Sequence, residues 1–215
     1  MSSQPMTPSI EITPITPGQI GKINENLAAA LRKSGLQSAL VQVVLETQGD
    51  ALTQELLETV RAHVEALSGL IIRKVKVDRT RTPQQALDAT GRRQYVDPKV
   101  VNAMPGRGEM VEEAEVFFFK PRPQAYDKNG LISDDRLEAE YDFHDFKPAD
   151  PYAQAAVNEA DPNFANDHPN GTHWKDKDGK WCFASFFRWL DEPRVHVYRR
   201  DLDWYDCWWF AGVRK

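Results

Sequence analysis

The chain has 215 residues, and its 27 Lys and Arg against 32 Asp and Glu give a formal net charge of −5. This acidity argues against a general nucleic-acid binder, while 41% hydrophobic and 27% charged residues are typical of a globular protein with one large domain or two small ones. All six Trp lie between Trp174 and Trp209, so we expect the last fifth of the chain to be built differently from the rest.

Membrane insertion, export and metal binding find no support in the sequence. No apolar run reaches the roughly 18 to 20 residues of a membrane span, and the first residues lack the basic and apolar regions of a signal peptide. We therefore expect a cytoplasmic protein. Its two cysteines, Cys182 and Cys207, are too few for a disulfide scaffold or a four-Cys zinc site, so we expect reduced thiols and no cofactor.

Residues 1–17 contain four Pro and are expected to be a disordered lead-in, followed at 18–110 by a small α/β unit with a linker helix. Helical spacing of apolar residues predicts a helix at 20–31 and a second at 52–67, which Asp50 can cap. Strands are predicted at 40–45 and 71–77. An αβαβ unit of this size is small for independent folding, so we expect it to support a homo-oligomer. Thr82 and Pro83 start a further helix, and the Pro- and Gly-rich stretch at 104–109 is the expected domain boundary.

The remaining residues, 111–215, are expected to form an α+β domain. A short apolar strand at 115–119 precedes two helices, which begin after Ser133 and Asp150, and a third, short helix near Phe164. From residue 173 onward the pattern is of short strands, at 182–187, 195–199 and 208–213, with a polar turn at 175–180. We interpret Asn170-Gly-Thr172 as a turn, although it matches a glycosylation sequon.

The segment from Arg194 to Trp204 has an unusual alternation. Successive side chains of a strand point to opposite faces. One face would carry Val195 and Val197, and the other a chemically mixed set, namely His196, Tyr198, Arg200 and Leu202. A core face would be uniformly apolar and a solvated face uniformly polar, so the mixed face is better explained as a binding surface.

The segment Pro169-Asn-Gly-Thr-His-Trp-Lys-Asp-Lys-Asp-Gly-Lys-Trp-Cys-Phe-Ala-Ser-Phe and the ending Trp208-Trp-Phe-Ala-Gly-Val-Arg-Lys215 resemble the variable proteins of diversity-generating retroelements. The resemblance covers residues 75–215. It implies a C-type-lectin-like fold related to the formylglycine-generating enzymes, here preceded by the small αβαβ unit. In that family, reverse transcription that miscopies template adenines rewrites Asn codons near the 3′ end of the gene. The positions at which family members often carry Asn are here Phe187, Leu190, His196, Tyr198, Arg200, Leu202, Tyr205 and Cys207, with Pro193 as a ninth.

The residue types at these nine positions agree with that mechanism. Each of them can be written by a codon ending in C, whereas Trp, Met, Gln, Lys and Glu cannot, and none of those five types occurs there. The residues between them are candidates for an invariant frame: Trp189, Val195, Val197, Trp204, Trp208, Trp209 and Phe210. The resemblance thus implies a hypervariable region at about 187–207 that binds a ligand, most simply a protein, and no catalysis.

Two other activities are known on related folds. Glu192-Pro-Arg194 and Trp204-Tyr-Asp206 are faintly similar to the calcium and sugar sites of C-type lectins, but both lack the Asn that would supply a carbonyl ligand. A formylglycine-generating enzyme would need catalytic cysteines or a copper site, and Cys207 lies at a position interpreted as variable.

A third alternative is a metal site formed by His144, Asp145, His168 and His173. Their spacing matches no known zinc motif, so ordinary surface or core histidines are the better interpretation.

Overall fold

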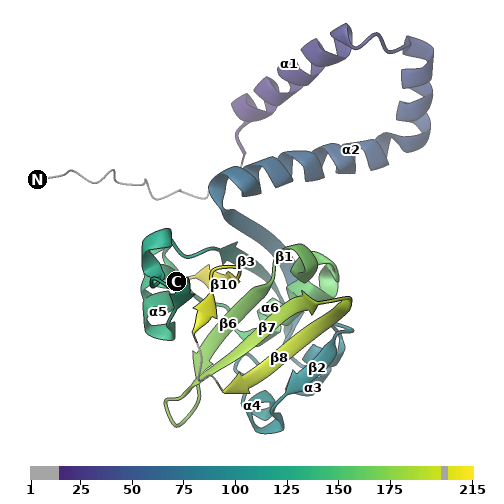
Figure 1. The fold of residues 1–215 in the computed structure, drawn as a ribbon. Coiled ribbons are helices and arrows are strands. Elements are labelled where there is room, and N and C mark those ends of the chain that lie inside the picture. Colours follow the sequence, from purple (N-terminus) through teal and green to yellow (C-terminus); the bar gives the residue numbers. More distant parts are fainter. Residues whose placement is uncertain (1–14, 200–202) are drawn as a thin grey trace, which may run out of the picture. The chain divides into compact units, whose positions relative to one another are not determined.

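The computed structural model describes residues 15–199 and 203–215 and divides the chain into two units, Met1–Val64 and Glu65–Lys215 (Figure 1). The expected lead-in therefore lies almost entirely outside the described residues. Within them, no helix is long and apolar enough to cross a membrane.

The first unit is helical. Helix α1 (Pro17–Lys33) begins with a capping box, in which Thr16 Oγ1 accepts from the Gln19 amide and the Gln19 side chain accepts from the Thr16 amide. Helix α2 (Ser38–Ser68) runs from the first unit into the second. The strand expected at 40–45 and the cap expected at Asp50 are both wrong, because the two segments belong to this one helix. A short apolar run fits either structure, and a nucleated helix extends at little cost.

The expected αβαβ unit is therefore also wrong. Strand β1 (Leu70–Asp78) does form, but it pairs along its whole length with β3 (Val111–Phe119), from Leu70 opposite Phe119 to Asp78 opposite Val111. The segment at 104–109, expected to separate two domains, is thus a connection within one sheet. Arg79 fixes it there, because its guanidinium donates to the Gly106 carbonyl at 2.7 Å.

Between β1 and β3 the chain forms three short elements. Helix α3 (Pro83–Asp88) starts at Thr82 with the predicted cap, a capping box completed by Gln85. Strand β2 and helix α4 follow at Arg93–Val96 and Pro98–Asn102.

The elements after β3 agree broadly with the predicted order of helices and then strands. Ser133 and Asp150 cap their helices as predicted. The turn at 175–180 joins two strands. The elements are η1 (Pro123–Ala125), β4 (Leu131–Ile132), α5 (Asp134–Phe143), β5 (Phe146–Pro148), α6 (Pro151–Ala160), α7 (Phe164–Asp167), β6 (Asn170–Lys175), β7 (Trp181–Trp189), β8 (Glu192–Arg199), β9 (Trp204–Tyr205) and β10 (Trp209–Arg214).

Eight of the described strands form one mixed sheet in the order β1-β3-β10-β6-β7-β8-β2, with β5 also paired to β10 (Figure 1). The β10–β6 and β2–β8 pairs are parallel and the others antiparallel. Strands β4 and β9 pair separately. The second unit is thus a mixed α+β domain.

Consecutive phenylalanines of β3 show that both faces of the sheet are covered. Phe118 packs against Phe164 at 4.8 Å between ring centroids, on the face that α6 and α7 cover. Phe119 points the other way and contacts Tyr141 of α5 at 5.0 Å. A strand buried on both faces is apolar at every position, which explains this uninterrupted run.

Asn170-Gly-Thr172, interpreted from sequence as a turn, is a buried part of β6. Gly171 is needed there because a Cβ at this position would lie 2.6 Å from the ring of Trp204. The glycine therefore makes room for an indole on the second face of the sheet.

Candidate functional site

The candidate site lies on the β7–β8 hairpin. In the register of these strands Ser185 is opposite His196, and Phe183 is opposite Tyr198, so these four side chains share one face. Val195 and Val197 point to the other face, where both are 0% exposed. The alternation predicted for residues 195–198 is confirmed.

A continuous set of rings covers the outer side of this hairpin. The His196 ring lies 4.7 Å from Phe187 and 6.0 Å from Tyr198, and Phe187 lies 5.6 Å from Trp208. We call this set the aromatic face; it comprises Tyr95, Phe183, Phe187, His196, Tyr198, Trp204 and Trp208.

Trp204 anchors the aromatic face. It is 2% exposed, and its indole N–H donates to Asp134 Oδ1 at 3.0 Å. Phe210 packs edge-on against it at 5.1 Å and is fully buried. Both residues are therefore buried, as a structural frame requires.

The other predicted frame residues are less buried. Trp208 and Trp209 are half-buried, whereas Trp189, 57% exposed, does not fit the prediction of a buried frame residue. Trp189 lies at the end of β7, where no element covers it as the sheet covers Trp204.

Tyr95 of β2 also belongs to the aromatic face, which the sequence did not indicate. Strand β2 pairs in parallel with β8, placing Tyr95 opposite His196 with 5.2 Å between ring centroids. Pairing between segments about a hundred residues apart leaves no local signal. Only the β character of residues 93–96 was available to suggest it.

A charged rim borders the aromatic face at Glu192. Its carboxylate accepts from Arg93 at 2.9 Å, from Arg194 at 2.7 Å and from the Tyr95 hydroxyl at 3.2 Å. Although burial opposes ionisation, these hydrogen bonds lower the pKa of Glu192. This carboxylate, part of the lectin-like Glu-Pro-Arg segment, is thus already held by two guanidinium groups.

His196 lies among aromatic rings and is half-buried. Its Nε2 has no hydrogen-bond partner among the described residues, and burial followed by the charge of Arg194 lowers its pKa. Its ring is therefore neutral at pH 7, and it presents an unpaired polar atom within an aromatic surface.

The remaining predicted positions lie at the edges. Leu190, in the β7–β8 turn, is 83% exposed, and Tyr205 on β9 is 63% exposed. Pro193 is exposed but lies opposite Arg188 in the register, on the side of Val195 rather than of His196. The structure therefore does not bring Pro193 to the aromatic face. Arg200 and Leu202 lie outside the described residues.

Neither cysteine has the features of an activated nucleophile. Cys207 is exposed and Cys182 buried, and both are free thiols. Desolvation and then a neighbouring carboxylate, Asp206 or Asp176 respectively, raise the pKa of each thiol. The thiolate, which is the reactive form, is disfavoured at both.

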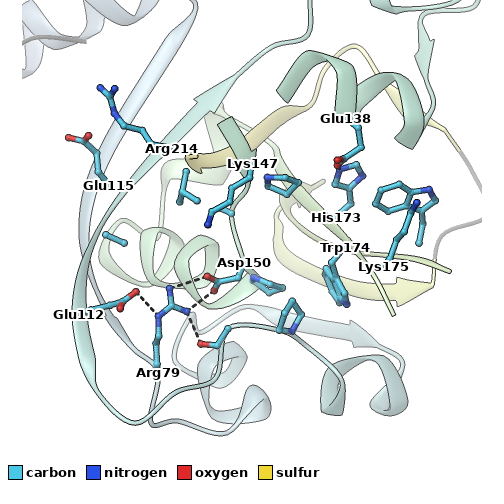
Figure 2. A pocket seen from close by; sticks show the side chains of 18 of the residues that line it. Arg79, Glu112, Glu115, Glu138, Lys147, Asp150, His173, Trp174, Lys175 and Arg214 are labelled. Carbon is cyan, nitrogen blue, oxygen red and sulfur yellow. Dashed lines mark hydrogen bonds and ion pairs between the residues drawn. The ribbon is translucent and has the colours of Figure 1, made fainter. Parts of the chain in front are cut away.

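A cavity of about 880 Å³ lies elsewhere in the second unit, and sequence reasoning missed it (Figure 2). Arg79 lies at one side, where it bridges Glu112 at 2.6 Å and Asp150 at 3.0 Å. His173 lies at the other side, 1% exposed, with hydrogen bonds of 2.7 Å to Asp134 and Glu138. Against the effect of burial, these carboxylates raise the pKa of His173.

The histidines considered as metal ligands have separate aromatic neighbours. His144 packs on Phe119 at 4.7 Å, and His168 packs on Phe164 at 5.2 Å. Across residues 15–199 and 203–215, no group of three or more His, Cys, Asp and Glu side chains is arranged to hold a metal ion.

No protein-family model, curated protein or solved structure matches this chain.

Proposed function

We propose that this protein is a ligand-binding module with a hypervariable recognition surface diversified by a retroelement. In this proposal Phe187, His196 and Tyr198 of the aromatic face vary together with Leu190, Tyr205 and Cys207, whereas Trp204 and Trp208 belong to the invariant frame. The observation that carries the proposal is the alternation in β8. Val195 and Val197 are completely buried, while the alternating residues His196 and Tyr198 project from the opposite face among aromatic rings.

In such an alternation, the buried side chains stabilise the fold and the side chains on the other face contact the ligand. The buried valines, Trp204 and Phe210 hold the strands in place through contacts that do not involve the variable side chains. Substitution at an exposed position, such as Leu190, Tyr198 or Tyr205, usually changes stability by no more than about 0.5 kcal/mol. The surface can then change its chemistry while the fold persists.

The backbone at Leu190 also supports the proposal. Its φ is +54°, in the left-handed region that Asn and Gly tolerate and a branched apolar residue disfavours. Asn is the residue that the family often carries at this position. A leucine there is readily explained as a product of codon rewriting rather than of selection for turn stability.

The chemistry of the surface suits a protein ligand. Tyr and Trp are rigid, amphipathic side chains that dominate binding hot spots and antibody paratopes. A standard interface uses roughly 20 to 30 residues per side, so the fixed rim of Arg93, Glu192 and Arg194 would contribute as well. A C-type-lectin-like fold for the second unit is part of this proposal.

Display of two libraries on the same chain tests the proposal. One library randomises Phe187, His196, Tyr198 and Tyr205. The matched control randomises four exposed positions on the β1–β3 pair, namely Lys74, Lys76, Val111 and Glu113.

After selection against a panel of purified proteins, we expect binders from the first library and few from the control. Equal yields from the two libraries would contradict a specialised binding face. So would a first library in which most members fail to fold.

A further inference from the structure

The first unit has a large apolar surface that none of its described residues, from 15 onward, covers. Neither α1 nor α2 contains a buried residue. In α1 every Ile and Leu is more than a third exposed, from 37% for Leu27 to 51% for Leu31. In α2 the exposed apolar residues are Leu40, Val43, Val44, Leu45, Leu56, Leu57, Val64 and Leu67.

Helices of this kind need a partner to be stable. Isolated helices are marginal in water, and most helical stability comes from packing of an apolar face. Within residues 15–64, the described part of this unit, the side-chain hydrogen bonds are local and span at most four residues. They stabilise single turns and hold no helix against another.

The spacing of the apolar residues indicates that the partner is another helix. Leu57, Val60, Val64 and Leu67 are separated by three, four and three residues, as are Ile20, Ile23, Leu27 and Ala30. This is the spacing of the a and d positions in a coiled-coil seam, where each side chain packs between residues of a facing helix.

The charges of the two helices favour a second copy of the same chain. Helix α1 has a net charge of +2, from Lys22, Arg32 and Lys33 against Glu25. The part of α2 in the first unit has a net charge of −3, from Glu46, Asp50, Glu55 and Glu58 against Arg61. The same attraction could act within one chain, but neither helix buries a residue against the other there. In a two-fold pair, α1 of each copy can face α2 of the other, so both contacts join opposite charges and cover the apolar residues.

The size of the surface is sufficient for a stable dimer. Helices α1 and α2 have 17 and 31 residues, and half of these, about 24, lies within the roughly 20 to 30 residues per side of a standard interface.

We infer that α1 and α2 form an intermolecular helical bundle with a second copy of the chain, so that the protein is a homodimer through its first unit. This inference does not depend on the proposed function. If that function holds as well, the dimer presents two recognition surfaces, and the second binding event to a multivalent ligand becomes intramolecular.

Light scattering after size-exclusion chromatography of the full chain tests the inference. At micromolar concentration we expect twice the chain mass of 24.5 kDa. A double substitution in the apolar stripe of α1, Ile23→Glu with Leu27→Glu, should give the monomer mass. The matched control, Lys22→Gln with Ala29→Glu, makes the same change of −2 in charge at exposed positions on the opposite face of the same helix and should remain dimeric.

Intrinsic fluorescence reports separately on the second unit, because all six Trp lie there. It should be unchanged in both variants, which excludes general unfolding as the cause of a mass change. A wild-type chain of 24.5 kDa would overturn the inference, because the helices would then be covered within one chain or remain uncovered. A stripe variant that stays dimeric would overturn it equally.

Discussion

The backbone of Leu190 lies in the left-handed region, and its side chain is almost entirely exposed to solvent. With φ at +54° and 83% exposure, it has the conformational cost of a turn residue without compensating contacts. Leu190→Asn should therefore stabilise the fold, by about 0.5–1 kcal/mol. Urea unfolding of the two proteins measures the difference. A loss of stability in the variant would mean that the leucine side chain makes a contact important for the turn.

His173 gives the fold a defined pH dependence. Burial disfavours its charged form, but hydrogen bonds with Asp134 and Glu138 outweigh this and raise the pKa of His173 in the folded state. Its contribution to stability is fully present below the unfolded-state pKa of about 6.5 and is lost as the pH rises through the higher folded-state value.

The free energy of unfolding should therefore fall as the pH rises above about 6.5, by about 1.4 kcal/mol for each unit by which the pKa is raised. His173→Gln should remove most of this slope, as measured by urea unfolding at several pH values. An unchanged slope in the variant would show that another group titrates.

At the scale of a strand, our proposal assigns the buried residues of β8 to folding and the adjacent residues on the aromatic face to recognition. Val197→Thr buries a hydroxyl at a fully buried position and should cost about 1–3 kcal/mol of stability. Tyr198→Thr introduces the same residue one position along, on the aromatic face, and should cost less than about 1 kcal/mol. Since both variants gain threonine in the same strand, β propensity is matched. Equal losses would contradict the division.

The elements differ in how well the sequence predicts them. The faces of β8 follow from strand geometry, and the caps at Thr82, Ser133 and Asp150 from local hydrogen bonding, so all were predictable. The apolar run at 40–45 fits a strand as well as a helix, and the length of the continuous helix decided the outcome.

Long-range pairing was not predictable. The β1–β3 and β2–β8 pairs join segments separated by whole elements, and no local pattern specifies which strands become neighbours. For this reason the sequence indicated Phe187, His196 and Tyr198 as binding residues but missed Tyr95 and Phe183. It also divided the chain at 104–109 instead of within α2.

At the scale of the whole molecule, the chain combines a helical unit, with no buried residue in its helices, and an α+β unit whose sheet carries the aromatic face. Our proposals give these units separate tasks, association for the first and recognition for the second. Dimerisation would increase avidity for a ligand with repeated epitopes without any change in the recognition surface.

The central claim, a surface diversified by a retroelement, is tested most directly by sequencing the DNA around the gene. We predict an adjacent reverse transcriptase gene and a second copy of the 3′ coding sequence. The two copies should differ chiefly where the second has adenines, within the codons for Phe187, Leu190, His196, Tyr198, Arg200, Leu202, Tyr205 and Cys207. A locus without such a repeat, or a repeat whose differences fall on the codons of Val195, Val197 and Trp204, would contradict the claim.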